Sequence, residues 1–208
     1  MIIQFLLFAS ADRLKFIVDV WYCKFHLKKD NYAFQLCSSL ASVTIGNSVT
    51  SIGVDAFENC SSLASLTIPV SVTSIGNYAF FECSKLASLT IGNSFTDIGN
   101  YAFAYCSSLP SVTIPDSVTS IDEYAFYQCS SLDNLVIPIT VNDISNKAFE
   151  KCSNLSNVVI SSNTTQYDNV FKDISSNPSL YYYDTNNTTY YVGALNNNNQ
   201  IVKKDPVE

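Results

Sequence analysis

The 208-residue sequence contains few charged side chains and almost no histidine. Only 14% of its residues are Asp, Glu, Lys or Arg, and the net charge is −7 with a sequence pI near 4.5. A nucleic-acid-binding protein needs a basic patch, so this composition excludes that class and leaves basic protein partners open. The single histidine, His26, and the lack of any C-x-x-C pair leave a zinc site or a Cys–His nucleophile without its residues. We therefore expect no metal, no cofactor and no enzyme activity.

The sequence also lacks a long apolar run. None approaches the roughly 20 residues of a membrane-spanning helix, so we expect no membrane span. The first residues, MIIQFLLFASAD, hold a short apolar stretch and an Ala9-Ser10-Ala11 sequence that is similar to a cleavage site. Because a basic region and a full-length hydrophobic region are missing there, a signal peptide and a truncated start both stay open.

What the sequence does contain is a repeat of 23 residues. In each full unit an L-x-x-L-x-I run with alternating apolar residues predicts a short strand, and Gly or Pro ends it. One unit cannot bury its apolar side chains alone, so we expect the units to stack as coils of a solenoid with one continuous core. The step of 23 aligns six cysteines and six leucines without an insertion: Cys37, Cys60, Cys83, Cys106, Cys129 and Cys152, then Leu40, Leu63, Leu86, Leu109, Leu132 and Leu155.

The N-terminal end of the array departs from the pattern. Ile17, Val20 and Tyr22 occupy the Leu, Val and Ile positions of a weaker unit. We expect residues 1–30 to form this degenerate repeat or cap, and residues 31–160 to form the regular solenoid.

The C-terminal end departs in a different way. Val170-Phe171 falls one residue short of the expected Ala-Phe pair, and SLYYYDTNNTTYYVG indicates a hairpin around residues 184–187. We expect residues 161–195 to be a capping segment made of a degenerate repeat and this hairpin. Residues 196–208 begin with NNNNQ, and we expect them to be a disordered tail.

Stacking places the repeat cysteines in a column. Residues 23 apart lie side by side at roughly 4.8 Å in a parallel solenoid. Side chains in a column point the same way, which holds their Cβ atoms beyond the usual disulfide separation. We therefore expect all six to be free, buried thiols that donate S–H to a neighbouring carbonyl. Cys23 aligns with the Gly/Pro turn position and is the candidate for an exposed, reactive thiol.

These units resemble a known family. LPSVTIPDSVTSIDEYAFYQCSS, residues 109–131, is similar to the 23-residue leucine-rich repeats of BspA-like proteins, with Asp122 in place of the usual Gly, and the resemblance covers about residues 31 to 160. It implies a right-handed leucine-rich-repeat coil with a parallel concave sheet and short turns or single helical turns on the convex side. It also implies a non-enzymatic protein, often displayed at the cell surface or outside the cell, that binds proteins or adheres to host cells and matrix. An intracellular, cytoplasmic scaffold without export is the alternative.

The outward positions of the strands are the candidate protein-binding residues. The strands of the first four full units each present a Ser and a Thr, and those of the next two present Asn134 with Val136 and Asn157 with Val159, so the concave face is neutral and rich in hydroxyls. In the weaker N-terminal unit, Asp19 and Trp21 fall in the same two columns, and Trp is a good anchor at interfaces. The alternatives are that the hydroxyls only bond along their own columns, or that they recognise ice or a glycan. The candidate residues are Asp19, Trp21, Ser42, Thr44, Ser65, Thr67, Ser88, Thr90, Ser111 and Thr113.

Two further patterns are interpreted as structural. Tyr32, Tyr78, Tyr101 and Tyr124 share one position of the repeat, and we interpret this column as aromatic packing between coils. Catalysis by carboxylates needs two of them at a set distance in a pocket, whereas the acids here lie at turn positions that differ from unit to unit. The oligomeric state cannot be derived from these patterns.

Overall fold

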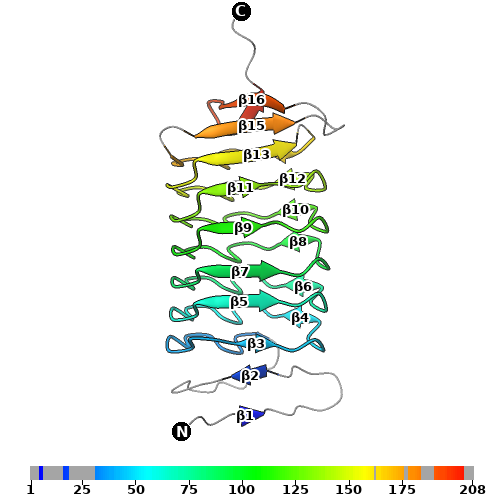
Figure 1. Ribbon diagram of the computed structural model, residues 1–208, viewed down its shortest axis with the longest axis vertical. Coiled ribbons are helices and arrows are strands. Elements are labelled where there is room, and N and C mark those ends of the chain that lie inside the picture. The colour runs from blue at the N-terminus through cyan, green and yellow to red at the C-terminus, as the bar shows by residue number, and fades with distance from the viewer. Residues whose placement is uncertain are drawn as a thin grey trace, which may run out of the picture.

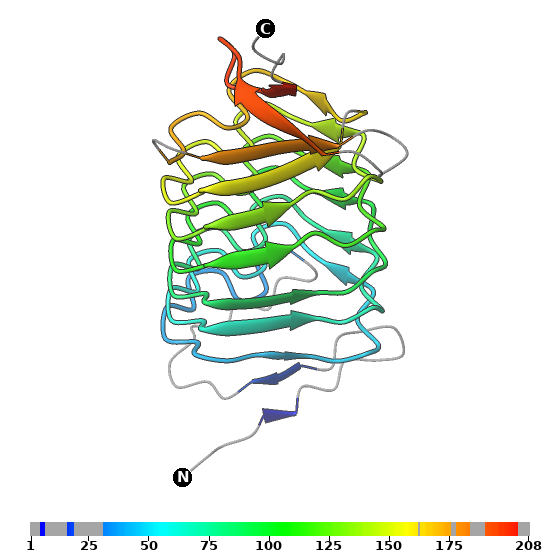
Figure 2. The ribbon, with the colours of Figure 1, turned by 45° about the horizontal axis from the view of Figure 1, so that its top comes forward.

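The computed structural model describes residues 5–6, 16–18, 31–161, 163–175, 178–183 and 190–203. Over these residues the chain forms a parallel β-solenoid and contains no helix (Figure 1). Each full coil has a long strand, a two-residue strand and a tight turn, and successive coils stack along one axis (Figure 2). The solenoid predicted from the 23-residue repeat is confirmed. No described helix could span a membrane.

The long strands stack to form one side of the solenoid. Residues 23 apart are partners, as in Leu66 with Leu89 and Leu135 with Val158. Pairing is interrupted between two of the coils. At this position of the repeat the backbone N–H of other units donates to the preceding coil, as Ala87 does to the Ala64 carbonyl at 2.9 Å. Pro110 occupies the position in one unit and has no N–H to donate. The long strands are β3 (Thr44–Ile45), β5 (Ser65–Ile68), β7 (Ser88–Ile91), β9 (Ser111–Thr113), β11 (Asn134–Val136), β13 (Asn157–Ser161) and β15 (Ser179–Tyr183).

The two-residue strands form a second parallel stack. In it Ile121 pairs with Ile98 of the preceding coil. Gly76 lies at the corner after one of these strands, and a Cβ there would lie 2.5 Å from the Val54 backbone nitrogen. The close approach of adjacent coils therefore requires glycine at this corner. The strands are β4 (Ser51–Ile52), β6 (Ser74–Ile75), β8 (Asp97–Ile98), β10 (Ser120–Ile121), β12 (Asp143–Ile144) and β14 (Thr165–Gln166).

The third side of each coil, the turn side, carries the Ala-Phe pair. Tyr78 and Glu82 flank this pair in one coil, and both have a positive φ of 57°. Tyr78, Phe80 and Glu82 donate their N–H groups to carbonyls of the following coil, each at 2.9 Å. Equivalent residues of the other coils repeat the pattern. Because these bonds all point toward the C-terminus, the last coil must find acceptors elsewhere.

The core consists of columns of identical side chains. Leu63, Leu86 and Leu109 are fully buried, and the phenylalanines of the turn side stack with centroids 5.0 to 5.6 Å apart. Each such side chain contributes about 1.5–3 kcal/mol when it is buried. Since every coil buries its side chains against two neighbours, the core is continuous along the solenoid. The stacked rings are Phe34, Phe57, Phe80, Phe103, Phe126, Phe149 and Phe171.

The cysteine column differs from the prediction at one position. Cys60, Cys83, Cys106, Cys129 and Cys152 are free and buried, as predicted. Each donates its S–H to the carbonyl of a phenylalanine in the preceding coil, at 3.2 to 3.4 Å. Cys37, however, is disulfide-bonded, so the prediction of six free thiols was wrong there. Cys37 belongs to the first regular coil, and no Ala-Phe turn precedes it in the sequence to supply the same acceptor.

Of residues 1–30, expected to form a degenerate repeat or cap, the structure describes two short strands, and these pair antiparallel rather than as a parallel coil. β1 (Phe5–Leu6) and β2 (Phe16–Val18) are antiparallel, and β2 also runs antiparallel to β3, with Ile17 opposite Thr44. A repeat unit would instead place Ile17 beside Leu40 in a parallel pair. The inward positions of such a unit would include His26 and Lys29, and burying these polar side chains is unfavourable. The two strands extend the N-terminal end of the sheet (Figure 1).

The C-terminal end adds a shortened coil and two antiparallel strands. β15 pairs in parallel with β13, and its Ser179 lies opposite Asn157, which is 22 residues earlier. β16 (Tyr190–Leu195) then runs antiparallel to β15, and β17 (Ile201–Lys203) runs antiparallel to β16. The shortened unit therefore stays in register with the solenoid.

The segment expected to be a disordered tail is ordered over residues 196–203. Asn169 and Phe171, in the turn of the last coil, donate their N–H groups to the carbonyls of Asn198 and Asn199 at 2.6 and 3.0 Å. Ile201 is fully buried. The segment thus supplies the acceptors that the last coil needs, and the prediction failed because backbone hydrogen bonds leave no pattern in side-chain composition.

Candidate functional site

The structure brings the eight described candidate residues onto one face. The outward side chains of the long strands form two columns, which we call the long-strand face. Ser65 and Thr67 lie opposite Ser88 and Thr90, and Ser42 bridges to Ser65. All eight side chains are exposed: Ser42, Thr44, Ser65, Thr67, Ser88, Thr90, Ser111 and Thr113.

The hydroxyls of this face are available to a ligand. None of the eight makes a side-chain hydrogen bond to another described residue, so the alternative in which they bond along their own columns is not what the structure shows. No outward position of the long strands from β3 to β15 carries a charge. The face therefore offers donors and acceptors without a charge of either sign.

Asp19 and Trp21 lie outside the described residues. They were placed in the Ser and Thr columns by assuming that residues 17–22 continue the parallel repeat. The antiparallel pairing of β2 with β3 removes that assumption. The place of these two residues among the candidate binding residues therefore stays a prediction.

The threonine column of the long-strand face becomes apolar toward the C-terminus. Val136 lies beside Thr113, and 59% of its surface is exposed. Strand pairing continues this column across three more strands, where the exposed fractions of Tyr181 and Val192 are 37% and 59%. Exposed apolar side chains on adjacent strands are typical of interaction sites. The apolar stripe consists of Val136 on β11, Val159 on β13, Tyr181 on β15 and Val192 on β16.

The second half of this stripe was missed in the sequence. Val136 and Val159 follow the 23-residue step, but Tyr181 comes after a step of 22 and Val192 lies on an antiparallel strand. The Val170-Phe171 pair, one residue short, was the signal that would have shifted the register and revealed Tyr181.

Three rings of the tyrosine column pack between coils, as predicted, whereas Tyr32 is separated from them by Asp55 and is 39% exposed. The rings of Tyr78, Tyr101 and Tyr124 stack with centroids 4.7 and 4.6 Å apart. Lys147 closes the column and donates a hydrogen bond of 2.7 Å from Nζ to the Tyr124 hydroxyl. Because the rings cover one another, their faces are not available to a ligand.

The carboxylates of the short-strand side gather near a shallow hollow. Asp122 occupies the usual glycine position and lines a hollow of about 340 Å³ with Glu123, its neighbour in sequence. Burial, followed by repulsion from Asp97 and Asp143, raises the pKa of the Asp122 carboxyl. Glu123 is exposed, and no group of three metal-ligating side chains occurs in the described part of the chain.

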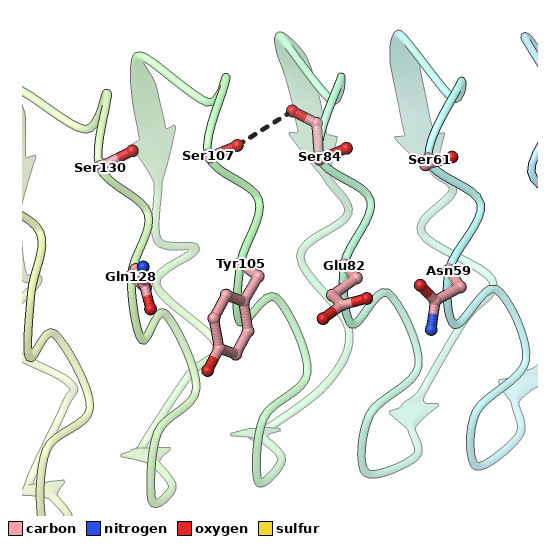
Figure 3. Close-up of a pocket in the computed structure, with 8 residues that line it drawn as sticks. All are labelled: Asn59, Ser61, Glu82, Ser84, Tyr105, Ser107, Gln128 and Ser130. Atoms are coloured by element: carbon pink, nitrogen blue, oxygen red, sulfur yellow. Dashed lines mark hydrogen bonds between the residues drawn. The ribbon is translucent and has the colours of Figure 1, made fainter.

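A polar groove of about 290 Å³ lies along the turn side, next to the tyrosine column (Figure 3). One wall is a column of serines that directly follow the buried cysteines. The other wall consists of residues with positive φ, whose backbone conformation turns their side chains into the groove. The lining residues are Asn59, Glu82, Tyr105 and Gln128 on this wall, and Ser61, Ser84, Ser107 and Ser130 on the serine wall.

Taken together, the stacked parallel coils, the columns of Leu and Phe, and an uncharged outward face define a leucine-rich-repeat solenoid. The model of the BspA type leucine rich repeat region matches the chain in six copies, over residues 28–115 and 96–203. The chain therefore belongs to the BspA-type leucine-rich-repeat family. No curated protein matches it.

Three of the solved structures to which this chain is similar come from bacteria. A leucine-rich repeat protein from Bacteroides ovatus is 23% identical, with a TM-score of 0.53 over 74% of this chain and 52% of that one. The T. pallidum leucine rich repeat protein is 24% identical, with a TM-score of 0.49 over 70% of this chain and 79% of that one. A leucine rich cell surface protein from Faecalibacterium prausnitzii is 33% identical, with a TM-score of 0.45 over 74% of this chain and 45% of that one.

Proposed function

We propose that this protein is a non-enzymatic protein-binding or adhesion module that engages its partner through the long-strand face. The observation that carries the proposal is the apolar stripe from Val136 to Val192 on four adjacent strands, in which Val136, Tyr181 and Val192 are exposed and Val159 is half-buried. An apolar centre with a polar, hydrogen-bonding rim is the common arrangement of protein interfaces. Here the stripe is the centre, and the serine and threonine columns form the rim.

The partner is a protein with an uncharged, apolar contact patch. Because the face has no charge, attraction between opposite charges contributes little to binding there. The family resemblance suggests a host-cell or matrix protein as the partner. Binding through this face should therefore change little between low and high salt, unlike capture by a charged surface.

Display at the cell surface or outside the cell is the second part of the proposal. The family resemblance supports it, and so does the disulfide bond of Cys37, because such bonds persist in oxidising compartments and are rare in the cytosol. An impermeant amine reagent applied to intact cells should label the full-length chain. If the chain is protected from the reagent, the alternative of an intracellular scaffold is favoured.

The binding face is tested by removing the apolar stripe. The double variant Val136→Ser, Val192→Ser should weaken binding to immobilised host matrix proteins at least tenfold, because interface energy concentrates in a few apolar anchors. Val70→Ser is the matched control, since Val70 is 69% exposed and lies in the corner after β5 rather than on the face. It should bind as the wild type does. The proposal would be contradicted if the double variant bound as tightly as the wild type, or if the wild type bound none of the immobilised matrix proteins.

A further inference from the structure

We propose that the groove of the turn side binds a neutral glycan in an extended conformation. This groove lies apart from the long-strand face, and the inference does not depend on the partner proposed above. Its lining combines one aromatic ring with amide, carboxyl and hydroxyl groups (Figure 3). A pyranose ring has an apolar C–H face and a rim of hydroxyls, so it needs both kinds of group.

Tyr105 supplies the aromatic surface. Tyr78, Tyr101 and Tyr124 stack face to face, but Tyr105 meets Phe81 and Tyr127 edge to face, at interplanar angles of 69° and 76°. Its neighbours in the groove column, 23 residues before and after, are Glu82 and Gln128. Figure 3 shows the Tyr105 ring in the groove between these two residues. Within the groove column Tyr105 therefore has no aromatic neighbour, and neither of its two ring contacts is a face-to-face stack.

The polar groups of the groove are available for sugar hydroxyls. The Glu82 carboxyl, the Gln128 amide and the Ser130 hydroxyl make no side-chain hydrogen bond to a described residue. Ser107 makes one, donating to the Ser84 carbonyl at 3.4 Å. Amide and carboxyl groups can each bond two adjacent hydroxyls of one sugar.

Other ligand classes fit the groove less well. An added peptide strand would need free backbone groups, but the Tyr105 N–H donates to the Tyr127 carbonyl at 2.8 Å and the Tyr105 carbonyl accepts from Ser107 at 2.8 Å. A phosphate or an anionic sugar would need a cation, whereas the lining contains no Lys or Arg and carries the Glu82 carboxyl. These contacts leave a neutral, hydroxyl-rich ligand.

The dimensions of the groove favour a chain over a single sugar. Its residues come from four successive coils, which are spaced by roughly 4.8 Å in a parallel stack. That spacing is close to the length of one pyranose residue in an extended glycan. Successive sugars can therefore lie against successive coils, and each coil offers one serine hydroxyl and one wall residue to the sugar beside it.

The test uses calorimetric titration of the full chain with cellohexaose and chitohexaose, two neutral and extended hexasaccharides. The wild type should bind at least one of them, and Tyr105→Ala should weaken that binding at least tenfold. Tyr101→Ala is the matched control, because it removes a ring of the same side that does not line the groove. It should change the affinity less than twofold.

The inference would be overturned if neither hexasaccharide bound at millimolar concentration, or if wild type and Tyr105→Ala bound equally well. The stripe variant Val136→Ser, Val192→Ser should still bind the hexasaccharide. Loss of glycan binding in that variant would place the site on the long-strand face and reject the groove. The glycan-binding test can therefore fail while the protein-binding test succeeds, and the reverse can also occur.

Discussion

At the scale of single residues, the repeated cysteine is a hydrogen-bond donor built into the core. In each coil from Cys60 to Cys152, the thiol bonds to a phenylalanine carbonyl of the coil before it. Burial raises the pKa of the Cys60 and Cys129 thiols to about 12, and that of Cys106 well above its ordinary value. The thiols therefore stay protonated and unreactive in the folded protein, because the thiolate is the nucleophile.

This protonation predicts how stability depends on pH. An unfolded thiol ionises near pH 9.0 but folded Cys129 only near 12, so the unfolded state binds fewer protons between these values and stability falls as pH rises. Cys129→Ala should cost about 1–2 kcal/mol at pH 7. Its deficit relative to the wild type should shrink by about 1.4 kcal/mol per pH unit above 9. Urea unfolding at pH 7 and pH 10 measures both values.

The control for this experiment is Val118→Ala, which shortens another fully buried side chain but removes no titratable group. Its cost should be the same at both pH values. A deficit of Cys129→Ala that does not change between pH 7 and pH 10 would mean that the thiol titrates normally in the folded state.

At the scale of elements, the turn side requires a special end at the C-terminus. The inter-coil N–H groups of the turn side donate to carbonyls of the following coil, so each coil supplies acceptors to the coil before it. The last coil takes its acceptors from residues 196–201. Gln166 strengthens this closure, because its side chain donates to the Ile201 carbonyl at 2.7 Å and accepts from the Ile201 N–H at 2.8 Å. Terminal repeats of solenoids generally need such a cap.

We predict that Ile201→Ala destabilises the C-terminal coil. Removing a fully buried isoleucine side chain costs about 2–5 kcal/mol. The amides of Asn169 and Phe171 should then lose protection in hydrogen exchange, because their acceptors lie in the released segment. Asn197→Ala, at an exposed position of the same segment, should leave both amides protected. Unchanged protection in Ile201→Ala would show that the segment is not the cap.

At the scale of the whole molecule, the solenoid presents different chemistry on different sides. The long-strand face is uncharged and partly apolar, whereas the turn side carries aromatic rings together with Lys147 and Lys151. The outward positions of the described long strands β3 to β15 carry none of the charged side chains. A rigid stack with separate faces can hold two ligands at once, since neither site shares a residue with the other.

The disulfide bond of Cys37 gives a prediction for the whole chain. The test uses protein that has been exported from the cell and then kept from further oxidation. Alkylation in denaturant without reductant should modify its five free repeat cysteines and leave Cys37 unmodified. In native protein those five should also resist alkylation, because they are buried. Mass spectrometry of the peptides measures both results. Alkylation of Cys37 without a reductant would remove this support for export.

Much of the fold could be predicted because residues one repeat length apart are neighbours in the stacked coils. The step of 23 identified Leu66 and Leu89 as partners and Ser65 and Thr67 as outward residues, and the structure confirms both. It could not identify the antiparallel pairing of β2, because antiparallel partners such as Ile17 and Thr44 have no fixed separation along the chain.

The sequence by itself determined the coil, its inward columns and the absence of charge on the long-strand face, because these follow from alternation along a strand and from the constant length of the repeat. Only the tertiary structure decided which outward residues become one surface. The stripe from Val136 to Val192 joins parallel and antiparallel strands, and the groove at Tyr105 depends on positive φ at its wall. Both depend on where the backbone directs a side chain, and a list of residue types does not contain that direction.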